Sequence, residues 1–260
     1  FFAEHQRQKT CDFKDELLVP YTTLPSLFNG LFGLAKTLFG VDIQPLSDCP
    51  TWHADVRVFG VYEDDKLRGC FYVDIHPRPG KQGGAWMEPL CHRGSEDGVA
   101  VGVIAGNLSR GPTHAETALE HREVQTLFHE FGHLMHHLLS DVTIGVLAGT
   151  NVAWDFVELP SQLLENWVWS KSALLSLFKH KDTGDPIPSD LVDRLLRTRR
   201  FRSASRLIRQ VTFSILDLEL HRLEPGSDAN HIALEIACRF SAVKLPSHYS
   251  MVTAFGHLFS

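Results

Sequence analysis

The sequence predicts a mainly α-helical fold with a small β-sheet, an α+β class, and three observations carry this prediction. A helical pattern of apolar residues covers 23–40, and strand-like runs of β-branched and aromatic residues follow it up to residue 107. From about residue 117 the strand signals vanish, and helical patterns continue to about residue 240. With 260 residues, 43% of them hydrophobic, the chain can bury a sizeable core.

The first helix is predicted over residues 23–40. Thr23 is a suitable N-cap, Pro25 falls in the first turn, and Gly40 marks the end of the pattern. The apolar residues in between recur at helical spacing: Leu24, Leu27, Phe28, Leu31, Leu34, Ala35 and Leu38. We expect this face to pack on a core.

A small sheet is predicted next. "DVRVFGVY" and "RGCFYVDIH" flank the polar turn 63–66, and their β-branched and aromatic residues predict an antiparallel hairpin. A third strand is predicted over residues 99–107. Residues 76–86, with two Pro and three Gly, are predicted to form the loop between them.

The second half of the chain is predicted to be helical. No flexible polar linker separates it from the first half, so we expect one partial domain over 1–260, with a helix and a small sheet in 1–112 and a helical part in 113–260. The predicted helices cover residues 117–140, 154–179, 189–198, 201–223 and 228–240.

Composition narrows the function classes. A formal net charge of -6 argues against general nucleic-acid binding, so peptides or small molecules are the expected partners. No stretch reads as a membrane span or a signal peptide, and the first residue is not Met, which suggests a fragment. The cysteines are odd in number, widely spaced and without a C-x-x-C pair: Cys11, Cys49, Cys70, Cys91 and Cys238. We therefore expect a cytoplasmic protein, and a monomer.

The segment "LFHEFGHLMHH" contains the pattern H-E-x-x-H at His129, Glu130 and His133. Residues four apart lie on one face of a helix, so the two imidazoles can bind one Zn²⁺ ion. Glu130 is rotated by about 100° from His129, which suits a general base acting on water at the metal. Gly132 lies inside the helix at a cost of about 1 kcal/mol, which indicates close approach of another backbone. The alternative is a buried helix with hydrogen-bonded core histidines.

A catalytic zinc site needs a third protein ligand, and Glu158 is the candidate. It follows His133 across a loop in which Gly145 and Gly149 allow the chain to turn back. Two further carboxylates, Asp155 and Glu165, are candidates for outer contacts to the ligand histidines. Alternatively, Asp155 is a helix cap and Glu165 an ordinary ion-pair partner.

Two segments, "TLFHEFGHLMHHLL" and "GTNVAWDFVELPSQLLENW", together resemble the active-site helices of the thimet-oligopeptidase family of zinc metallopeptidases. Weaker similarity covers "WHADVRVFGVYE", "LRGCFYVDIHPRPGKQGGAWM", "RQVTFSILDLELH" and "AFGHLF". The resemblance implies zincin-type active-site helices in a neurolysin-like catalytic lobe. It implies His129, His133 and Glu158 as zinc ligands, Glu130 as the catalytic residue, and short peptides as substrates.

The resemblance also implies that His257 contacts the substrate. The family's tyrosine-rich segment after this histidine has no counterpart, because the chain stops at Ser260, and a large N-terminal helical part is also missing. The chain therefore resembles the central part of a longer enzyme, a partial peptidase catalytic domain. Three functions stay open: a metalloendopeptidase, a dipeptidyl carboxypeptidase, and a truncated zinc-binding remnant with impaired catalysis.

Other features have simpler interpretations. The arginine-rich run 194–209 could recognise a carboxylate or nucleic acid, although a solvated turn with arginines paired to local acids is the more common case. A second metal site at His133 and His137 lacks a suitably spaced acidic ligand. An extended peptide is expected to pair with the edge of strand 99–107, unless both edges of that strand are already paired.

Overall fold

The computed structural model describes residues 2–93, 98–113, 116–255 and 258. The chain divides into two compact units, Phe1–Thr198 and Arg199–Ser260. This division falls near the end of a helix. Each unit is described separately.

The first unit begins with α1 (Phe2–Cys11), the short 3-10 helix η1 (Asp15–Leu18) and α2 (Leu24–Phe39). The predicted helix 23–40 is confirmed. Thr23 is its N-cap residue, although its side chain makes no capping hydrogen bond, and Pro25 occupies the first turn. Gly40 ends the helix in the left-handed region at φ 75°, a conformation that glycine adopts without a steric penalty.

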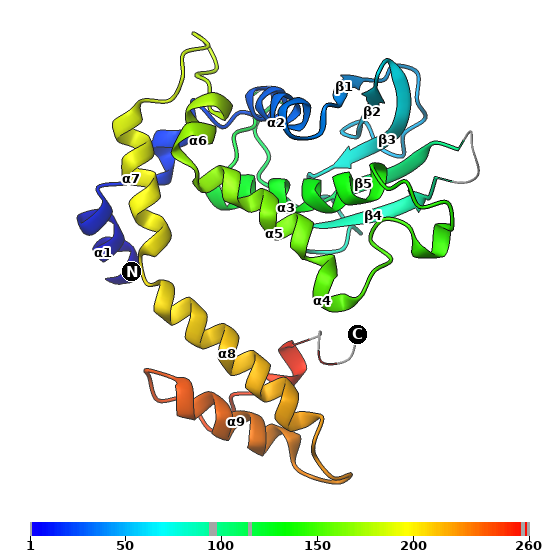
Figure 1. The fold of residues 1–260 in the computed structure, drawn as a ribbon. Helices are drawn as coiled ribbons and strands as arrows, with labels where there is room; N and C mark the ends of the chain where they lie inside the picture. The colour runs from blue at the N-terminus through cyan, green and yellow to red at the C-terminus, as the bar shows by residue number, and fades with distance from the viewer. Residues whose placement is uncertain (1, 94–97, 114–115, 256–257, 259–260) are drawn as a thin grey trace. The chain divides into compact units, whose positions relative to one another are not determined.

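One mixed five-stranded sheet follows, with the strand order β1-β2-β3-β5-β4 (Figure 1). β3 pairs antiparallel with β2 and parallel with β5, whereas β4 pairs antiparallel with β5. The predicted hairpin is confirmed as β2 and β3. The strands are β1 (Asp42–Pro45), β2 (Arg57–Glu63), β3 (Lys66–Asp74), β4 (Trp86–Cys91) and β5 (Ala100–Ala105).

The prediction of an exposed edge at residues 99–107 is wrong. β5 lies between β3 and β4, so both of its edges are already hydrogen-bonded. The strand at this edge of the sheet is β4, which the sequence pattern missed because its Pro89 and polar Glu88 weaken the strand signal. Pro89 is tolerated there because an edge strand leaves some backbone groups unpaired.

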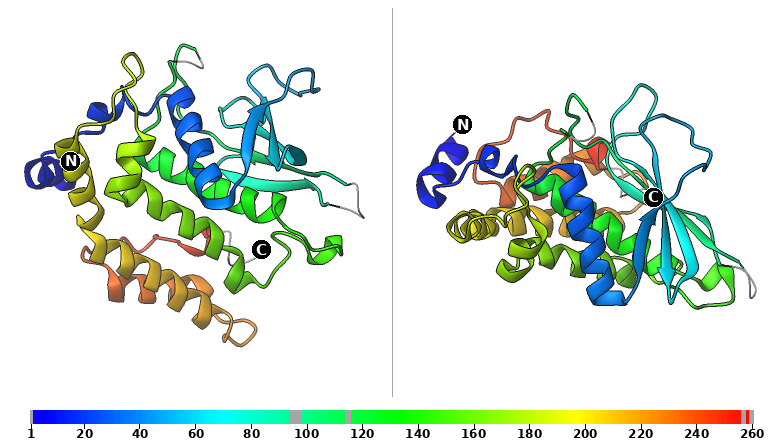
Figure 2. Two further views of the ribbon diagram at one scale, coloured as in Figure 1. Left: turned by 45° about the horizontal axis from the view of Figure 1, so that its top comes forward. Right: turned by 90° about the horizontal axis from the view of Figure 1, so that it is seen from above.

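Helices α2 and α3 (His121–Leu138) pack on the sheet, as two further views show (Figure 2). Aromatic rings fill the layer between them: Phe59 stacks on Phe71 at 5.3 Å, and Phe71 meets Phe131 of α3 edge to face at 6.3 Å. Gly69 and Gly102 let α3 approach closely, because an added Cβ would come within 3.1 Å of Leu138 or 2.7 Å of Leu134. The sheet therefore fixes the position of α3.

The predicted continuous helix 154–179 is wrong. The chain forms four short helical pieces there, and Glu158 lies at the junction of the first two. Pro160 in the first turn of the second piece cannot donate the hydrogen bond that a continuous helix would need. The pieces are α4 (Trp154–Val157), α5 (Leu159–Glu165), η3 (Asn166–Trp169) and α6 (Lys171–Leu177), preceded by η2 (Gly145–Leu147) and followed by α7 (Ser189–Arg200).

The second unit is a pair of packed helices, α8 (Ser203–Leu220) and α9 (Ala229–Phe240), followed by η4 (Val252–Ala254). These helices confirm the patterns at 201–223 and 228–240. Its small core is formed by the following side chains: Leu216, Ala233, Ala237 and Met251, with Phe213, Leu220, Ile236, Leu245, Val252 and Phe255 packed against them.

All five cysteines are free thiols. Within the described residues, no helix is both long enough and apolar enough to cross a membrane.

Candidate metal centre

Helix α3 presents the H-E-x-x-H residues from a firmly placed element. Its N-terminus has a capping box, in which the Glu123 side chain accepts a hydrogen bond from the Glu120 backbone N–H at 2.9 Å and the Glu120 side chain accepts one in return. Leu127, Phe128 and Leu134 are essentially fully buried. The rest of the helix therefore anchors His129 and His133, and neither imidazole needs to hold the helix in place.

Gly132 lies where α3 and α5 meet. A Cβ at this position would come within 2.6 Å of Ser161 Cα and 2.8 Å of the Pro160 carbonyl oxygen. Only a glycine allows this approach, as the cost of a mid-helix glycine indicated. The contact brings the start of α5, and with it Glu158, to the histidine face of α3.

The structure brings His129, His133 and Glu158 together. Glu158 Oε2 lies 3.1 Å from Nε2 of His129 and 3.2 Å from Nε2 of His133. The two imidazoles are 4.9 Å apart between ring centroids and nearly perpendicular. Among the described residues this is the one group of three or more His, Cys, Asp or Glu side chains whose ligand atoms all lie within 4.8 Å of one another.

These donors fit a divalent cation. Zinc bonds of about 2.0–2.2 Å in a tetrahedron place neighbouring ligand atoms about 3.3 Å apart, close to the two distances between Glu158 Oε2 and the imidazoles. Burial lowers the pKa of His133, although Glu158 partly opposes this effect, so a neutral ring offers a lone pair. Lone pairs of imidazole and carboxylate that face each other repel, and a cation between them removes the repulsion.

Glu165 holds the ring of His129 from behind. Its Oε1 lies 2.7 Å from His129 Nδ1, so that a proton on Nδ1 leaves Nε2 free to face Glu158. Gln125 donates to the other oxygen of Glu165 at 2.5 Å and accepts a hydrogen bond from Trp169 Nε1 at 3.1 Å. A connected chain of four side chains thus fixes one ligand's orientation.

Ser161 plays a similar part for the carboxylate. Its hydroxyl lies 2.8 Å from Glu158 Oε2 and 2.9 Å from the Glu158 carbonyl oxygen, so it holds the side chain at the helix junction. Asp155, by contrast, is exposed in α4, and no hydrogen bond joins it to His129 or His133 in the described structure.

Glu130 is a buried carboxyl group next to the ligand cluster, only 7% exposed. Burial raises its pKa; the charge of His129 lowers it, Glu158 raises it further, and the backbone N–H of Met87 in β4 lowers it. A carboxyl whose pKa is raised toward neutrality is suited to accept and return a proton. The contact with Met87 also ties this residue to the edge strand.

Other expected residues have separate positions. His257 lies outside the described residues. His137 Nε2 lies 3.1 Å from the carbonyl oxygens of both Cys91 and Val101, so it links α3 to β4 and β5 and is not turned toward a second metal site. Trp154, at the start of α4, is 83% exposed.

Sequence reasoning missed Ser161, Gln125 and Met87 as contacts of the site. Ser161 follows Glu158 at i+3, and Gln125 precedes His129 at i−4. These helical spacings are the signal that could have found the two polar residues. Nothing in the local sequence places Met87 beside Glu130, because that contact comes from the fold.

Comparison with known proteins agrees with this geometry. A model of "Peptidase family M3" matches residues 1–260. Oligopeptidase A of Escherichia coli K12 is 38% identical over 270 aligned positions, which cover the whole chain and 40% of that protein. Organellar oligopeptidase A of Arabidopsis thaliana is 36% identical over 100% of the chain. A dipeptidyl carboxypeptidase of Salmonella typhimurium is 32% identical over 90% of the chain and 35% of its own length.

The chain thus spans about 40% or less of the length of these relatives. The aligned part includes both helices that carry the candidate ligands.

Proposed function

Because the chain belongs to peptidase family M3, we propose that it forms the zinc-binding part of a metalloendopeptidase that hydrolyses short oligopeptides. The observation that carries this proposal is the convergence of His129, His133 and Glu158 with the buried Glu130 beside them. The comparisons support a peptidase, and the metal and the roles of the individual residues are inferred from the geometry.

The proposed mechanism assigns each residue a task. His129, His133 and Glu158 would hold a Zn²⁺ ion, which would supply Lewis acidity and lower the pKa of water toward neutrality. Glu130 accepts a proton from the attacking water and returns it to the leaving amine. Glu165 keeps His129 oriented through its 2.7 Å contact. His257 is proposed to contact the substrate.

We propose β4 as the strand that receives the peptide. β4 is at an edge of the sheet, and its Met87 backbone contacts Glu130. An extended peptide paired with this strand would pass in front of the catalytic carboxyl group, which places the scissile bond near the metal. Pro89 limits the number of hydrogen bonds that the strand donates.

The second candidate is a dipeptidyl carboxypeptidase, favoured by the similarity to the Salmonella protein of that name. The chemistry at the metal would be the same, but cleavage would require a free C-terminal carboxylate. Amidation of the peptide C-terminus should stop this activity and leave an endopeptidase active.

We also propose that the protein is a cytoplasmic monomer. Five free thiols and the similarity to a probable cytosolic oligopeptidase A of Arabidopsis thaliana support the compartment. Light scattering on the purified chain would test the monomer.

The decisive experiment measures bound zinc and cleavage of a quenched fluorescent peptide on the same sample of the 260-residue chain and of its full-length protein. Glu130→Gln should retain one zinc per chain and lose peptide hydrolysis in the full-length protein. Full activity of this variant would remove Glu130 from the mechanism. Zinc without hydrolysis in the 260-residue chain, with hydrolysis in the full-length protein, would identify the chain as a catalytically impaired part.

A further inference from the structure

The arginine-rich run separates into paired and unpaired arginines. Arg194 forms an ion pair with Asp190 at 3.1 Å, Arg197 donates to the Cys11 carbonyl oxygen at 3.3 Å, and Arg206 donates to the Arg199 carbonyl oxygen at 2.7 Å. Of these three, only Arg194 pairs with a local acid, as the simple interpretation expects, whereas Arg197 and Arg206 donate to backbone carbonyl oxygens.

Arg202 and Arg209 differ from them. Within the described residues neither guanidinium group has a hydrogen bond or an ion pair with a carboxylate. Arg209 makes a cation–π contact, with its guanidinium carbon 4.7 Å from the centroid of the Phe213 ring. The reason lies in the charge distribution of the second unit. Residues 199–209 contain five arginines and no acid, whereas all five acids of the unit lie further along: Asp217, Glu219, Glu224, Asp228 and Glu235.

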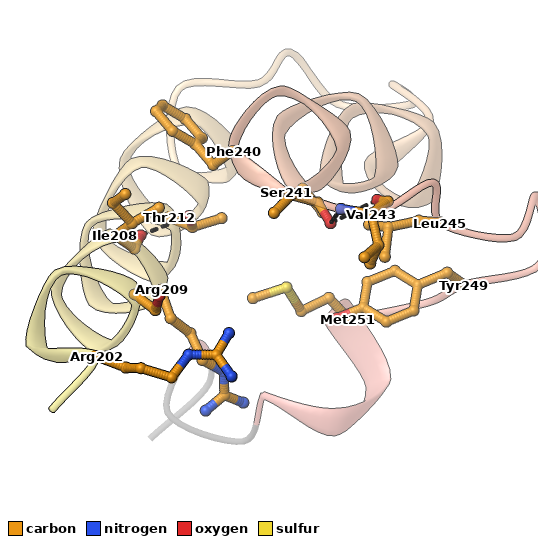
Figure 3. Close-up of a pocket in the computed structure, with 13 residues that line it drawn as sticks. Arg202, Ile208, Arg209, Thr212, Phe240, Ser241, Val243, Leu245, Tyr249 and Met251 are labelled. Atoms are coloured by element: carbon orange, nitrogen blue, oxygen red, sulfur yellow. Dashed lines mark hydrogen bonds between the residues drawn. The ribbon is translucent and has the colours of Figure 1, made fainter. Parts of the chain in front are cut away.

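These two arginines line a cavity of about 370 Å³ that lies wholly within the second unit. Figure 3 shows their side chains at one end of the cavity, with mostly apolar side chains and the polar Thr212 and Ser241 around the remainder. The apolar lining includes Ile208, Phe240, Val243, Leu245 and Met251, and Tyr249 adds an aromatic ring. None of the described residues that line this cavity is acidic.

The cavity combines the two chemistries of an amphiphilic anion site. A planar guanidinium group binds a carboxylate with two parallel hydrogen bonds, and the first backbone N–H groups of α8, which begins after Arg202, add positive potential. The apolar walls suit a hydrocarbon side chain, and they would not suit phosphate or a nucleic-acid backbone. Ser205 supplies a hydroxyl group at the wall for an amide.

We propose that this cavity binds the C-terminal residue of a peptide, with the α-carboxylate on Arg202 and Arg209 and an apolar side chain among Phe240, Val243 and Leu245. As a statement about substrates it rests on the proposed peptidase function. The binding itself needs neither zinc nor catalysis, so the two proposals fail in different experiments.

Met251 provides the probe. It lines the cavity, whereas the other two methionines, Met87 and Met135, lie on β4 and α3 of the first unit. In the zinc-free 260-residue chain with ¹³C-labelled methionine methyl groups, N-acetyl-L-phenylalanine should shift the Met251 methyl resonance to saturation. The Met87 and Met135 resonances serve as internal references.

Matched ligands and variants complete the test. Three matched ligands should each bind at least about tenfold more weakly than N-acetyl-L-phenylalanine. N-acetyl-L-phenylalanine amide lacks the carboxylate, inorganic phosphate lacks the apolar group, and hexanoate lacks the amide. Arg202→Gln and Arg209→Gln should each weaken binding about tenfold. Arg222→Gln is the charge-matched control, because Arg222 pairs with Glu219 outside the cavity.

The proposal would be overturned by the absence of a shift of the Met251 methyl resonance, by equal binding of the amide, or by equal binding to Arg209→Gln and Arg222→Gln. Equal binding of phosphate would mean a general anion site, and equal binding of hexanoate a fatty-acid site; either result contradicts recognition of a peptide end. A resolved, folded-state Met251 methyl resonance in each ligand-free variant would establish that the second unit remains folded, and unchanged Met87 and Met135 resonances would establish the same for the first unit.

Discussion

Two carboxylates of the first unit, Asp74 and Glu158, are both surrounded by nitrogen atoms, but their charges are balanced in different ways. Asp74 is buried at the end of β3 and accepts hydrogen bonds from Arg78 at 2.6 and 2.7 Å, from Lys81 at 2.9 Å and from Trp52 at 2.8 Å. Permanent cations therefore neutralise it inside the protein.

Glu158 is half-exposed and faces two imidazoles and the Ser161 hydroxyl. No Lys or Arg lies within ion-pair distance of it in the described part of the chain. The comparison teaches that a structural carboxylate carries its own counter-charge, whereas a ligand carboxylate is left for a cation to balance. The predictions below test this distinction, from the largest effect to the smallest.

Asp74→Asn should lower the free energy of unfolding by about 3–5 kcal/mol, because it leaves the buried Lys81 without its counter-charge. Burial alone would raise the pKa of Asp74, but Arg78, Trp52 and Lys81 hold that pKa well below its usual range. A lowered folded-state pKa adds stability above the unfolded-state pKa of about 4, and this stability is lost as the pH falls below it.

Urea unfolding of the metal-free chain between pH 3 and pH 7 measures both effects; the variant should show a flatter acid limb. Asp193→Asn is the control, because the Asp193 pair with Lys171 is exposed and should change stability by less than about 1 kcal/mol. Equal losses from the two substitutions would contradict a structural role for the Asp74 cluster.

In contrast to Asp74→Asn, Glu158→Gln should weaken zinc binding without lowering the stability of the metal-free chain. We expect zinc affinity to fall at least about 100-fold, since loss of an outer contact alone costs about 10–100-fold. Metal-free stability should stay the same or rise, because the carboxylate no longer faces imidazole lone pairs. Competition with a zinc chelator and urea unfolding measure the two quantities. Unchanged zinc affinity would remove Glu158 from the ligand set.

Glu165→Gln tests the orientation of His129. The amide keeps the size of the side chain but removes the charge that holds His129 Nδ1 at 2.7 Å, so zinc affinity should fall about 10–100-fold. Asp155→Asn is the matched control, and it should leave affinity unchanged because its exposed side chain does not contact either histidine. If Asp155→Asn weakened zinc binding as much as Glu165→Gln, the outer contacts would need to be reassigned.

The sequence predicted those parts of the fold and site that depend on local spacing. His129 and His133 share a face because they are four apart on α3, and Gly132 marked the contact with α5 by its cost within a helix. Parts that depend on distant contacts were not predictable. β4 has a weak local pattern and exists through pairing with β5, and Pro160 divides the helix that apolar periodicity alone would extend.

Gly132→Ala carries the smallest expected effect and tests how the ligand helices are joined. A Cβ within 2.6 Å of Ser161 Cα meets backbone, which cannot rotate away, so α5 must move. Overpacking of about 1–3 kcal/mol, offset by about 1 kcal/mol of helix propensity, leaves a net loss of up to about 2 kcal/mol. The same shift displaces Glu158 and should weaken zinc binding.

Gly33→Ala in α2 is the control, because the added Cβ has open space around it. It should stabilise the chain by up to about 1 kcal/mol without changing zinc affinity. If both variants behaved alike, propensity and not helix contact would explain Gly132.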